Sequence, residues 1–277
     1  LALWRAGAPG SWMARLRGGV IMAMALTAAV ALGAIAAQIR TVAVAQSAFA
    51  RNQAPAGVDG WVMDVDRSDG GPRLRLLVKS IENVAHPPRY VRVAVPEAGV
   101  LSAGRSAHCF AVLGPPSGPL APGGYDFARR AYFERLGTTG YSYGSCRPRD
   151  LPAPGFWFDR WRLKLGALRA DLSAAIQEAA PGRGGAIAAA LIAGDVSAID
   201  KDTNDALRNS GLGHLLSVSG VHMGIVGGLV FAVLTGFLAL ISPLALRLPV
   251  KKIAAVGALI ALAAYFVISG ASVPALR

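Results

Sequence analysis

The sequence is poor in charge and has few cysteines, histidines and aromatic residues. Charged residues make up 16 % of the 277 residues, whereas a soluble domain carries about 25 %. Three blocks contain no Asp, Glu, Lys or Arg, namely residues 18–39, 209–246 and 253–276. Each block is long enough for a helix that crosses the bilayer core, which takes about 20 apolar residues. The sequence therefore excludes a soluble single-domain enzyme and predicts an α-helical membrane protein.

Acidic residues are missing from both ends of the sequence. All 16 lie between Asp59 and Asp205, and seven of the 28 Lys and Arg flank the apolar blocks: Arg5, Arg15, Arg17, Arg247, Lys251, Lys252 and Arg277. Short cytoplasmic loops carry an excess of Lys and Arg, so we expect residues 1–17 and the 247–252 turn in the cytoplasm. If the first and second apolar blocks each cross the membrane once, residues 40–208 between them are predicted on the periplasmic face of a bacterial inner membrane. Much of the net charge of +12 is thus explained by topology rather than by nucleic-acid binding.

The first apolar block has two interpretations. A signal-peptide core would end at a small-residue site such as Ala43-Val44-Ala45. The length of the block and the later blocks favour a retained helix, and we assign residues 1–45 to an N-terminal transmembrane segment. The sequence starts at Leu1 and stops at Arg277, directly after an apolar block, so we expect a piece of a longer protein.

Residues 57–150 change to a β-strand pattern. Short stretches of alternating or β-branched residues are separated by turns rich in Gly, Pro and Asp. Five strands are predicted, with a short helix at 126–136 before the last: 61–66, 73–79, 90–95, 107–113 and 138–143. This order suits a small, partly open barrel of the OB type. The predicted fold class is an α-helical membrane protein with an inserted all-β, OB-like barrel domain.

Residues 156–210 return to helical periodicity. Apolar residues at steps of three and four share one helix face: Trp157, Trp161, Leu165, Leu168, Leu172 and Ile176. With Trp at one end and cations on the flank, this helix suits a membrane interface. The alternative is a soluble helix that packs on the barrel. A short helix at 186–193 follows, and the capping-box-like stretch Ser197–Asp200 predicts the start of another that reaches Arg208.

Cys109 and Cys146 are the only cysteines in the sequence. Both fall in the part predicted to be exported, where an oxidising compartment favours a disulfide over a metal site. A structural zinc site takes four ligands, and only His86 and His108 lie nearby in the sequence. We therefore predict one disulfide, with two free thiols as the alternative, and neither a metal nor a cofactor.

Cations and aromatic residues cluster on the predicted strands. Arg73, Arg75 and Lys79 have even spacings and therefore share one strand face. OB barrels grip single strands with cations and aromatic platforms. The alternative is a solvated face, balanced by Asp64 and Asp66. The candidate DNA-binding residues are Trp61, Arg73, Arg75, Lys79, Arg89, Tyr90 and Arg92.

The 209–246 block contains polar residues at membrane depth, where such groups usually face a cavity or a helix interface. His214, Ser217, Ser219 and His222 would line a polar path, with Gly220 as a break in the helix. The alternative is that His214 caps the helix at the interface and the serines bond back to the helix backbone.

The stretch Gly211-Leu-Gly-His-Leu-Leu-Ser-Val-Ser-Gly-Val-His-Met closely resembles the membrane core of ComEC-type competence proteins. Ala190–Asp195 and Gly270–Arg277 resemble further parts of that core. Pro122–Phe127, with Tyr132 and Gly137 after it, resembles the OB-like domain at the start of the family. Residues 211–277 would then begin a polytopic competence core, whose channel-core motif includes His214, Ser217, Ser219, Gly220 and His222.

The resemblance implies an inner-membrane DNA-uptake channel component for natural transformation, which passes single-stranded DNA to the cytoplasm. It implies single-stranded DNA, the lipid bilayer and other competence-machinery proteins as partners, and it is compatible with a homo-oligomer. Many family members continue into a metallo-hydrolase-like domain, but this sequence has none of its His and Asp clusters, so we predict no enzyme in these residues. The rivals are an envelope assembly or docking module without DNA transport, and an intramembrane hydrolase that uses Ser219 and His222.

Overall fold

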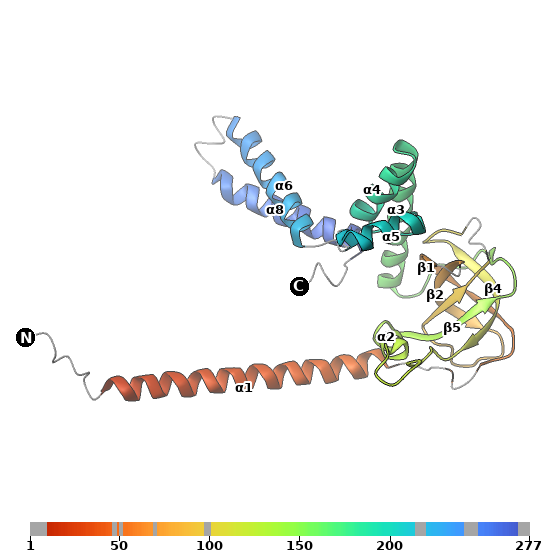
Figure 1. The fold of residues 1–277 in the computed structure, drawn as a ribbon, viewed down its shortest axis with the longest axis horizontal. Coiled ribbons are helices and arrows are strands. Elements are labelled where there is room, and N and C mark those ends of the chain that lie inside the picture. Colours follow the sequence, from red (N-terminus) through yellow and green to blue (C-terminus); the bar gives the residue numbers. More distant parts are fainter. Residues whose placement is uncertain are drawn as a thin grey trace, which may run out of the picture.

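The computed structural model describes residues 10–45, 49, 52–68, 71–96, 101–213, 220–240 and 249–270. Within this part of the chain, a β-barrel is flanked by long helices on both sides of it in sequence (Figure 1). Three helices are long and apolar enough to cross a membrane, at Gly18–Val44, Gly220–Leu240 and Val250–Ile268. The predicted fold class, a helical membrane protein with an inserted barrel, is confirmed.

Helix α1 (Gly10–Val44) projects from the barrel as one long rod (Figure 1). Helices α6 (Gly220–Leu240) and α8 (Val250–Ile268) pack against each other as a hairpin. A Cβ added to Gly227 would lie 2.8 Å from the Leu262 side chain, and one added to Gly257 would lie 2.5 Å from that of Leu234. Small residues that admit a neighbouring side chain are typical of helix contacts in membranes.

The barrel consists of β1 (Ala56–Ser68), β2 (Gly71–Ile81), β3 (Tyr90–Ala94), β4 (Ser106–Gly114) and β5 (Leu136–Ser142). Neighbours follow the order β1-β2-β3-β5-β4, and β1 also pairs with β4, so the sheet is closed. Only the β3–β5 pair among these is parallel. Helix α2 (Phe127–Phe133) precedes β5, and β6 (Arg147–Pro148) adds to β4.

The five strands, with a helix before the last, occur along the chain as predicted, but the barrel is closed rather than partly open. Strand β1 is 13 residues long and has register irregularities at Asp59/Gly60 and Val62/Asp64. Such bulges bend a strand, and β1 thereby reaches both β2 and β4. A Cβ on Gly60 would lie 2.5 Å from the Leu77 carbonyl oxygen, so this close approach requires glycine.

The interior of the barrel is aliphatic and contains the disulfide. Fully buried residues from all sides of the barrel include Val58, Val62, Leu74, Leu76, Val91, Val93 and Leu113. Cys109 and Cys146 belong to the same core and form a disulfide, with their Cα atoms 4.5 Å apart. The predicted bond is thus present, and it ties β4 to the segment that follows β5.

Helix α3 (Trp157–Ala179) packs on the outside of the barrel, but not through its apolar stripe. The buried residues of the helix are Asp159, Leu163, Gly166 and Ser173. Trp157, Trp161 and Leu168 of the stripe keep 69 %, 45 % and 54 % of their surface exposed. The helix thus packs on the barrel, as the alternative predicts, but through this narrower face, while part of the apolar stripe stays exposed.

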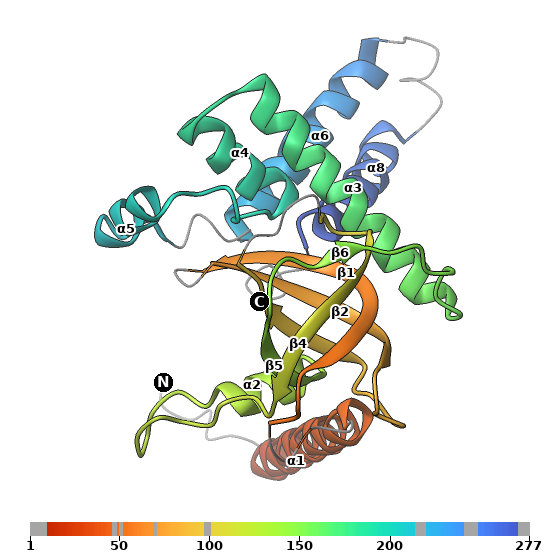
Figure 2. The same cartoon turned by 90° about the vertical axis from the view of Figure 1, so that its right-hand side faces the viewer.

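Helix α4 (Arg183–Ala193) ends at Gly194, which adopts the left-handed conformation expected of a helix stop. Helix α5 (Lys201–Asn209) begins later than the sequence predicts. Its N-cap is Asp200, whose carboxylate accepts the Thr203 N–H at 3.2 Å. Ser197 does not cap this helix, and its N–H donates to the Asp195 carboxylate at 2.9 Å. Figure 2 shows α3 and α4 on one side of the barrel and α1 with α2 on the opposite side.

Candidate functional site

The outer face of β1, β2 and β3, where the sequence predicts base stacking, is covered by α2 and α3. A second apolar cluster fills this contact: Trp61, Leu77, Tyr90, Ala131, Leu136 and Leu163. Trp61 keeps 9 % and Tyr90 2 % of its surface exposed. Neither ring can offer a face to a base, so the prediction that they stack bases is wrong. The strand pattern could not show this, because Ala131 and Leu163, which cover Tyr90, lie on helices more than 40 positions further along the sequence.

Three guanidinium groups surround the buried ring of Tyr90. Those of Arg75, Arg89 and Arg162 lie 5.0, 5.7 and 5.9 Å from the ring centroid. Arg162 on α3 also donates a hydrogen bond to the Tyr90 hydroxyl at 3.1 Å. Cation–π contacts of this kind strengthen when they are removed from solvent. The cluster therefore fastens α3 to the barrel.

Three of the predicted DNA-binding cations have partners inside the protein. Arg75 donates to the Glu134 carbonyl oxygen at 2.7 Å, and burial lowers the pKa of its guanidinium. Arg89 donates to both carboxylate oxygens of Asp159, at 2.8 and 3.0 Å. Arg92 lies 3.4 Å from the Glu134 carboxylate. These contacts join the barrel to α2 and α3, which is the structural role that the sequence pattern did not reveal.

Like Arg89, which is paired with Asp159, Arg73 and Lys79 are exposed. They lie near the two ends of β2. The structure thus gathers Trp61, Arg75, Arg89, Tyr90 and Arg92 around one internal contact. A phosphate could reach Arg73 and Lys79, and also the exposed Arg89, whose guanidinium is already paired with Asp159.

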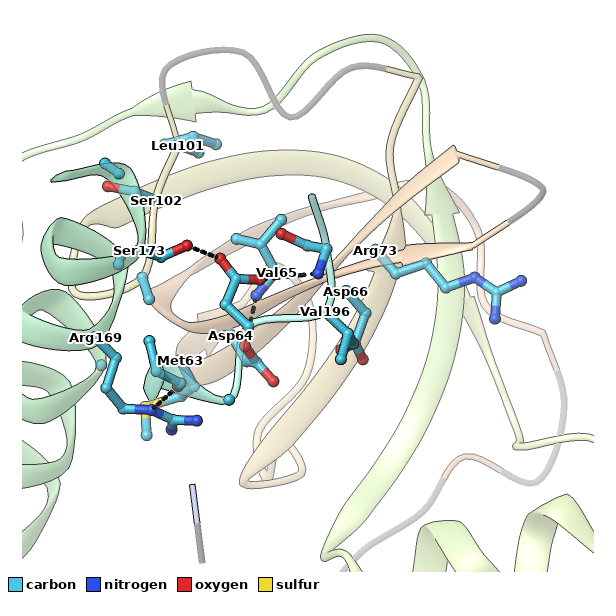
Figure 3. Close-up of a pocket in the computed structure, with 18 of the residues that line it drawn as sticks. Met63, Asp64, Val65, Asp66, Arg73, Leu101, Ser102, Arg169, Ser173 and Val196 are labelled. Atoms are coloured by element: carbon cyan, nitrogen blue, oxygen red, sulfur yellow. Dashed lines mark hydrogen bonds between the residues drawn. The ribbon is translucent and has the colours of Figure 1, made fainter. Parts of the chain in front are cut away.

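A cavity of about 550 Å³ lies between the barrel and helices α3 and α4 (Figure 3). Its wall carries both signs of charge, with the acids Asp64, Asp66 and Asp195 and the cations Arg73, Arg92 and Arg169. Burial raises the pKa of Asp64, and the negative charge of Asp66 raises it further. The mixed lining does not favour a polyanion. Among the described residues, no group of three His, Cys, Asp or Glu could hold a metal ion.

One end of this cavity is a junction that the sequence did not predict, centred on Gly194 and Asp195. The Asp195 carboxylate accepts a hydrogen bond from the Ser173 hydroxyl at 2.6 Å (Figure 3). Burial alone would raise its pKa, but hydrogen bonds from Ser173 and Ser197 and the charge of Arg169 outweigh burial and lower it. Arg169 also donates to the Ala193 carbonyl oxygen at 3.2 Å.

The same junction receives the end of α8. The Tyr265 hydroxyl donates to the Leu191 carbonyl oxygen at 2.9 Å. A Cβ on Gly194 would lie 2.2 Å from the Ser269 carbonyl oxygen. Only glycine permits this approach, and its positive φ of 70° adds a second reason for glycine. The junction therefore links α3, α4 and α8. The part of it that the sequence analysis singles out is the stretch Ala190–Asp195.

The membrane motif is described only in part. His214, Ser217 and Ser219 lie outside the described residues, so the predicted polar path cannot be traced. Gly220 is the first residue of α6, and His222 in its first turn is half-buried.

The stretch that contains α2 contacts the end of α1. Asp126 is the N-cap of α2, and its carboxylate accepts the Arg129 N–H at 2.9 Å. The Tyr132 hydroxyl donates to the Thr41 carbonyl oxygen at 2.7 Å, and Arg135 donates to that of Ala43 at 3.2 Å. Carbonyl groups in the last turn of a helix lack partners within the helix, and a cation there is favourable. The barrel is thereby held at the end of α1.

The comparisons with known proteins give one family. Residues 191–277 match the family described as Competence protein. No curated protein and no solved structure matches the chain. The matched residues run from the end of α4 through the Gly194 junction, α5, α6 and α8. The match covers less than half of the chain and shows that residues 191–277 are similar to that family. It includes two of the three helices able to cross a membrane.

Proposed function

We propose that this chain belongs to an inner-membrane DNA-uptake channel and that its barrel contacts the incoming single strand outside the membrane. The observation that carries the proposal is the family match over residues 191–277. The match includes α6 and α8, two of the three helices able to cross a membrane. Uptake of one DNA strand is what the resemblance to ComEC-type proteins implies.

The proposed orientation puts the barrel in the periplasm. Lys251 and Lys252 stand at the start of α8, which favours a cytoplasmic turn before it. Helix α1 then leads outward and α6 leads inward, with the barrel between them in the chain. We divide the protein accordingly into a transmembrane segment (1–45), an exported barrel (57–150), a helical region (156–210) and the start of the competence core (211–277).

We further propose that the start of α3 rests in the outer lipid interface. Four neighbouring aromatic residues keep 40–69 % of their surfaces exposed: Phe156, Trp157, Phe158 and Trp161. Their rings contact one another, as in the Phe158–Trp161 pair with centroids 5.9 Å apart. Exposed Arg160 and Lys164 stand beside them. Aromatic rings next to cations are typical of helices that lie in the interface.

The DNA contact of the proposal includes Arg73 and Lys79, the exposed cations of β2. We would place the full chain in nanodiscs of neutral lipid and measure the anisotropy of labelled oligo-dT and of a duplex at several salt concentrations. Each phosphate contact contributes about 0.7 to the slope of log affinity against log salt for single strands. We expect oligo-dT to bind more tightly than the duplex, and Arg73→Ala with Lys79→Ala to reduce the slope.

The rival function is an envelope docking module without DNA transport. In that case the full chain would show no affinity for oligo-dT at low salt, or would bind heparin and DNA alike through charge alone. Either result would contradict the proposed DNA contact while leaving the membrane assignment in place.

A further inference from the structure

An exposed row of aromatic rings lies on the outside of β4 and β5. Phe110, Tyr141 and Tyr143 keep 49 %, 52 % and 57 % of their surfaces exposed. The ring centroids of Phe110 and Tyr143 are 6.3 Å apart, and those of Tyr141 and Tyr143 are 5.6 Å apart. Their planes meet at 42° and 66°, so the rings do not stack on one another. Each ring therefore keeps a face open to solvent.

The outward direction of these rings follows from the barrel. Burial alternates along β4, where Cys109, Ala111 and Leu113 are inside and Phe110 is exposed. Strand pairing sets Ala111 opposite Ser142, and the Tyr143 N–H donates to the Phe110 carbonyl oxygen at 2.8 Å. The rings thus come together although Phe110 and Tyr141 are 31 positions apart in sequence.

The backbone beneath the rings is fixed by several bonds. The Ser142 hydroxyl donates to the carbonyl oxygens of Phe110 and Gly144, at 3.1 and 2.8 Å. The disulfide joins Cys109, the neighbour of Phe110, to Cys146, which is three residues beyond Tyr143. A rigid surface loses little entropy when a ligand binds to it. The row is therefore prepared for contact with flat groups.

The charge around the rings suits a polyanion. Residues 136–149, which include β5 and β6, contain Arg147 and Arg149 but no Asp or Glu, and β4 contains no acid either. Strand pairing sets Arg147 opposite His108, which is two residues from Phe110. The nearest acid to His108 by contact is Asp59, and Arg149 pairs with its carboxylate at 2.8 Å. Strands β4, β5 and β6 therefore contain no carboxylate that would repel a phosphate.

The position of the row also suits a ligand that arrives from outside. Figures 1 and 2 place β4 on the side of the barrel away from α6 and α8. OB barrels usually bind oligonucleotides on the face of strands 2 and 3, but α2 and α3 cover Trp61 and Tyr90, the aromatic residues predicted to stack bases, here. The β4–β5 surface is the aromatic surface of the barrel that remains open among the described residues.

We propose that Phe110, Tyr141 and Tyr143 form a stacking platform for the unpaired bases of single-stranded DNA. The inference rests on the proposed uptake function and gives it a second, separate contact surface. Bases stack on such rings without regard to sequence, because every base has a flat face. Phosphates that follow the bases would meet Arg147.

The test compares two aromatic pairs of the full chain in neutral nanodiscs. Phe110→Ala with Tyr143→Ala removes part of the platform, and Tyr125→Ala with Phe127→Ala is the matched control. The control pair is equally exposed, at 59 % and 52 %, and its rings are also in contact, at 4.8 Å. We expect the platform variant to bind oligo-dT about 5- to 150-fold more weakly per ring that carries a base. The salt slope should stay unchanged, and the control pair should bind like the parent.

Photo-crosslinking of DNA to the unaltered chain tests the platform even where a variant folds poorly. Oligonucleotides with iodinated deoxyuridine should attach to Phe110, Tyr141 or Tyr143 of the unaltered chain, and Tyr143→Phe should retain the affinity. Equal affinity of parent and platform variant, with crosslinks elsewhere, would overturn the platform but leave the proposed function standing. A parent that binds no single strand would overturn both. Loss of peptidoglycan binding alone in the platform variant would assign the rings to an envelope glycan and contradict the proposal.

Discussion

At the scale of single residues, Gly194 has two separate reasons to be glycine. Its φ is 70°, and the Ser269 carbonyl oxygen would lie 2.2 Å from an added Cβ. Gly211 has a similar φ of 74° but no atom within 4 Å of an added Cβ. A substitution at Gly211 therefore introduces backbone strain alone, whereas one at Gly194 introduces both strain and crowding.

We expect Gly194→Ala to destabilise the protein more than Gly211→Ala does. Strain in the left-handed region costs about 1–3 kcal/mol, and at Gly194 the clash with Ser269 adds to it. Thermal unfolding in detergent would measure both variants. Equal losses at the two positions would show that α8 does not approach the α4 stop closely.

The Asp195 carboxylate gives the junction a dependence on pH. Its pKa is lowered in the folded protein, so the stabilisation is complete above the ordinary range of Asp, near 4. It is lost as the pH falls through the lower folded value. Ser173→Ala should cost about 1–2 kcal/mol at pH 7, because it removes a hydrogen bond to a charged acceptor.

Denaturation of Ser173→Ala at pH 7 and at about pH 3 would measure this loss. We expect the cost to shrink in acid, and to be independent of pH in an Asp195→Asn background. A cost that stays the same at both pH values in the presence of Asp195 would show that the Ser173 bond does not depend on the carboxylate charge.

At the scale of elements, α3 shows what periodicity can and cannot predict. The spacing of its apolar residues predicts the helix over 156–179, and the structure has it at Trp157–Ala179. The face that packs on the barrel was not predictable, because Gly166 and Leu163 fit it by shape while Trp157 and Trp161 stay outside. Likewise, strand alternation predicts the order of β1 to β5, but it cannot show that helices cover Trp61 and Tyr90.

Quenching of tryptophan fluorescence by brominated lipids tests the interfacial position of α3. Lipids with bromine near the headgroup should quench the parent more than Trp157→Phe with Trp161→Phe, because these two rings would lie in the interface. Trp61→Phe is the matched control, since Trp61 is buried in the barrel. Equal quenching of the parent and the double variant would place the start of α3 away from lipid.

At the scale of the whole molecule, two connections set the barrel relative to the helices. Tyr132 and Arg135 hold the end of α1, and the Gly194 junction joins α3 and α4 to the end of α8. Figure 1 shows α1, α6 and α8 extending from the barrel toward the same side. Apolar blocks and basic clusters in the sequence predicted the spans, whereas these connections are formed by residues far apart in the chain and needed the structure.

The proposed periplasmic position of the barrel underlies every proposed DNA contact, and cysteine labelling tests it directly. Ser117→Cys lies on an exposed loop of the barrel, and Lys251→Cys lies at the exposed start of α8. The native cysteines are joined in a disulfide and would not react. A membrane-impermeant maleimide should label position 117 in spheroplasts with an intact inner membrane, and position 251 only after lysis. Labelling of position 251 from outside, with position 117 protected, would contradict the orientation and the proposed contact with incoming DNA.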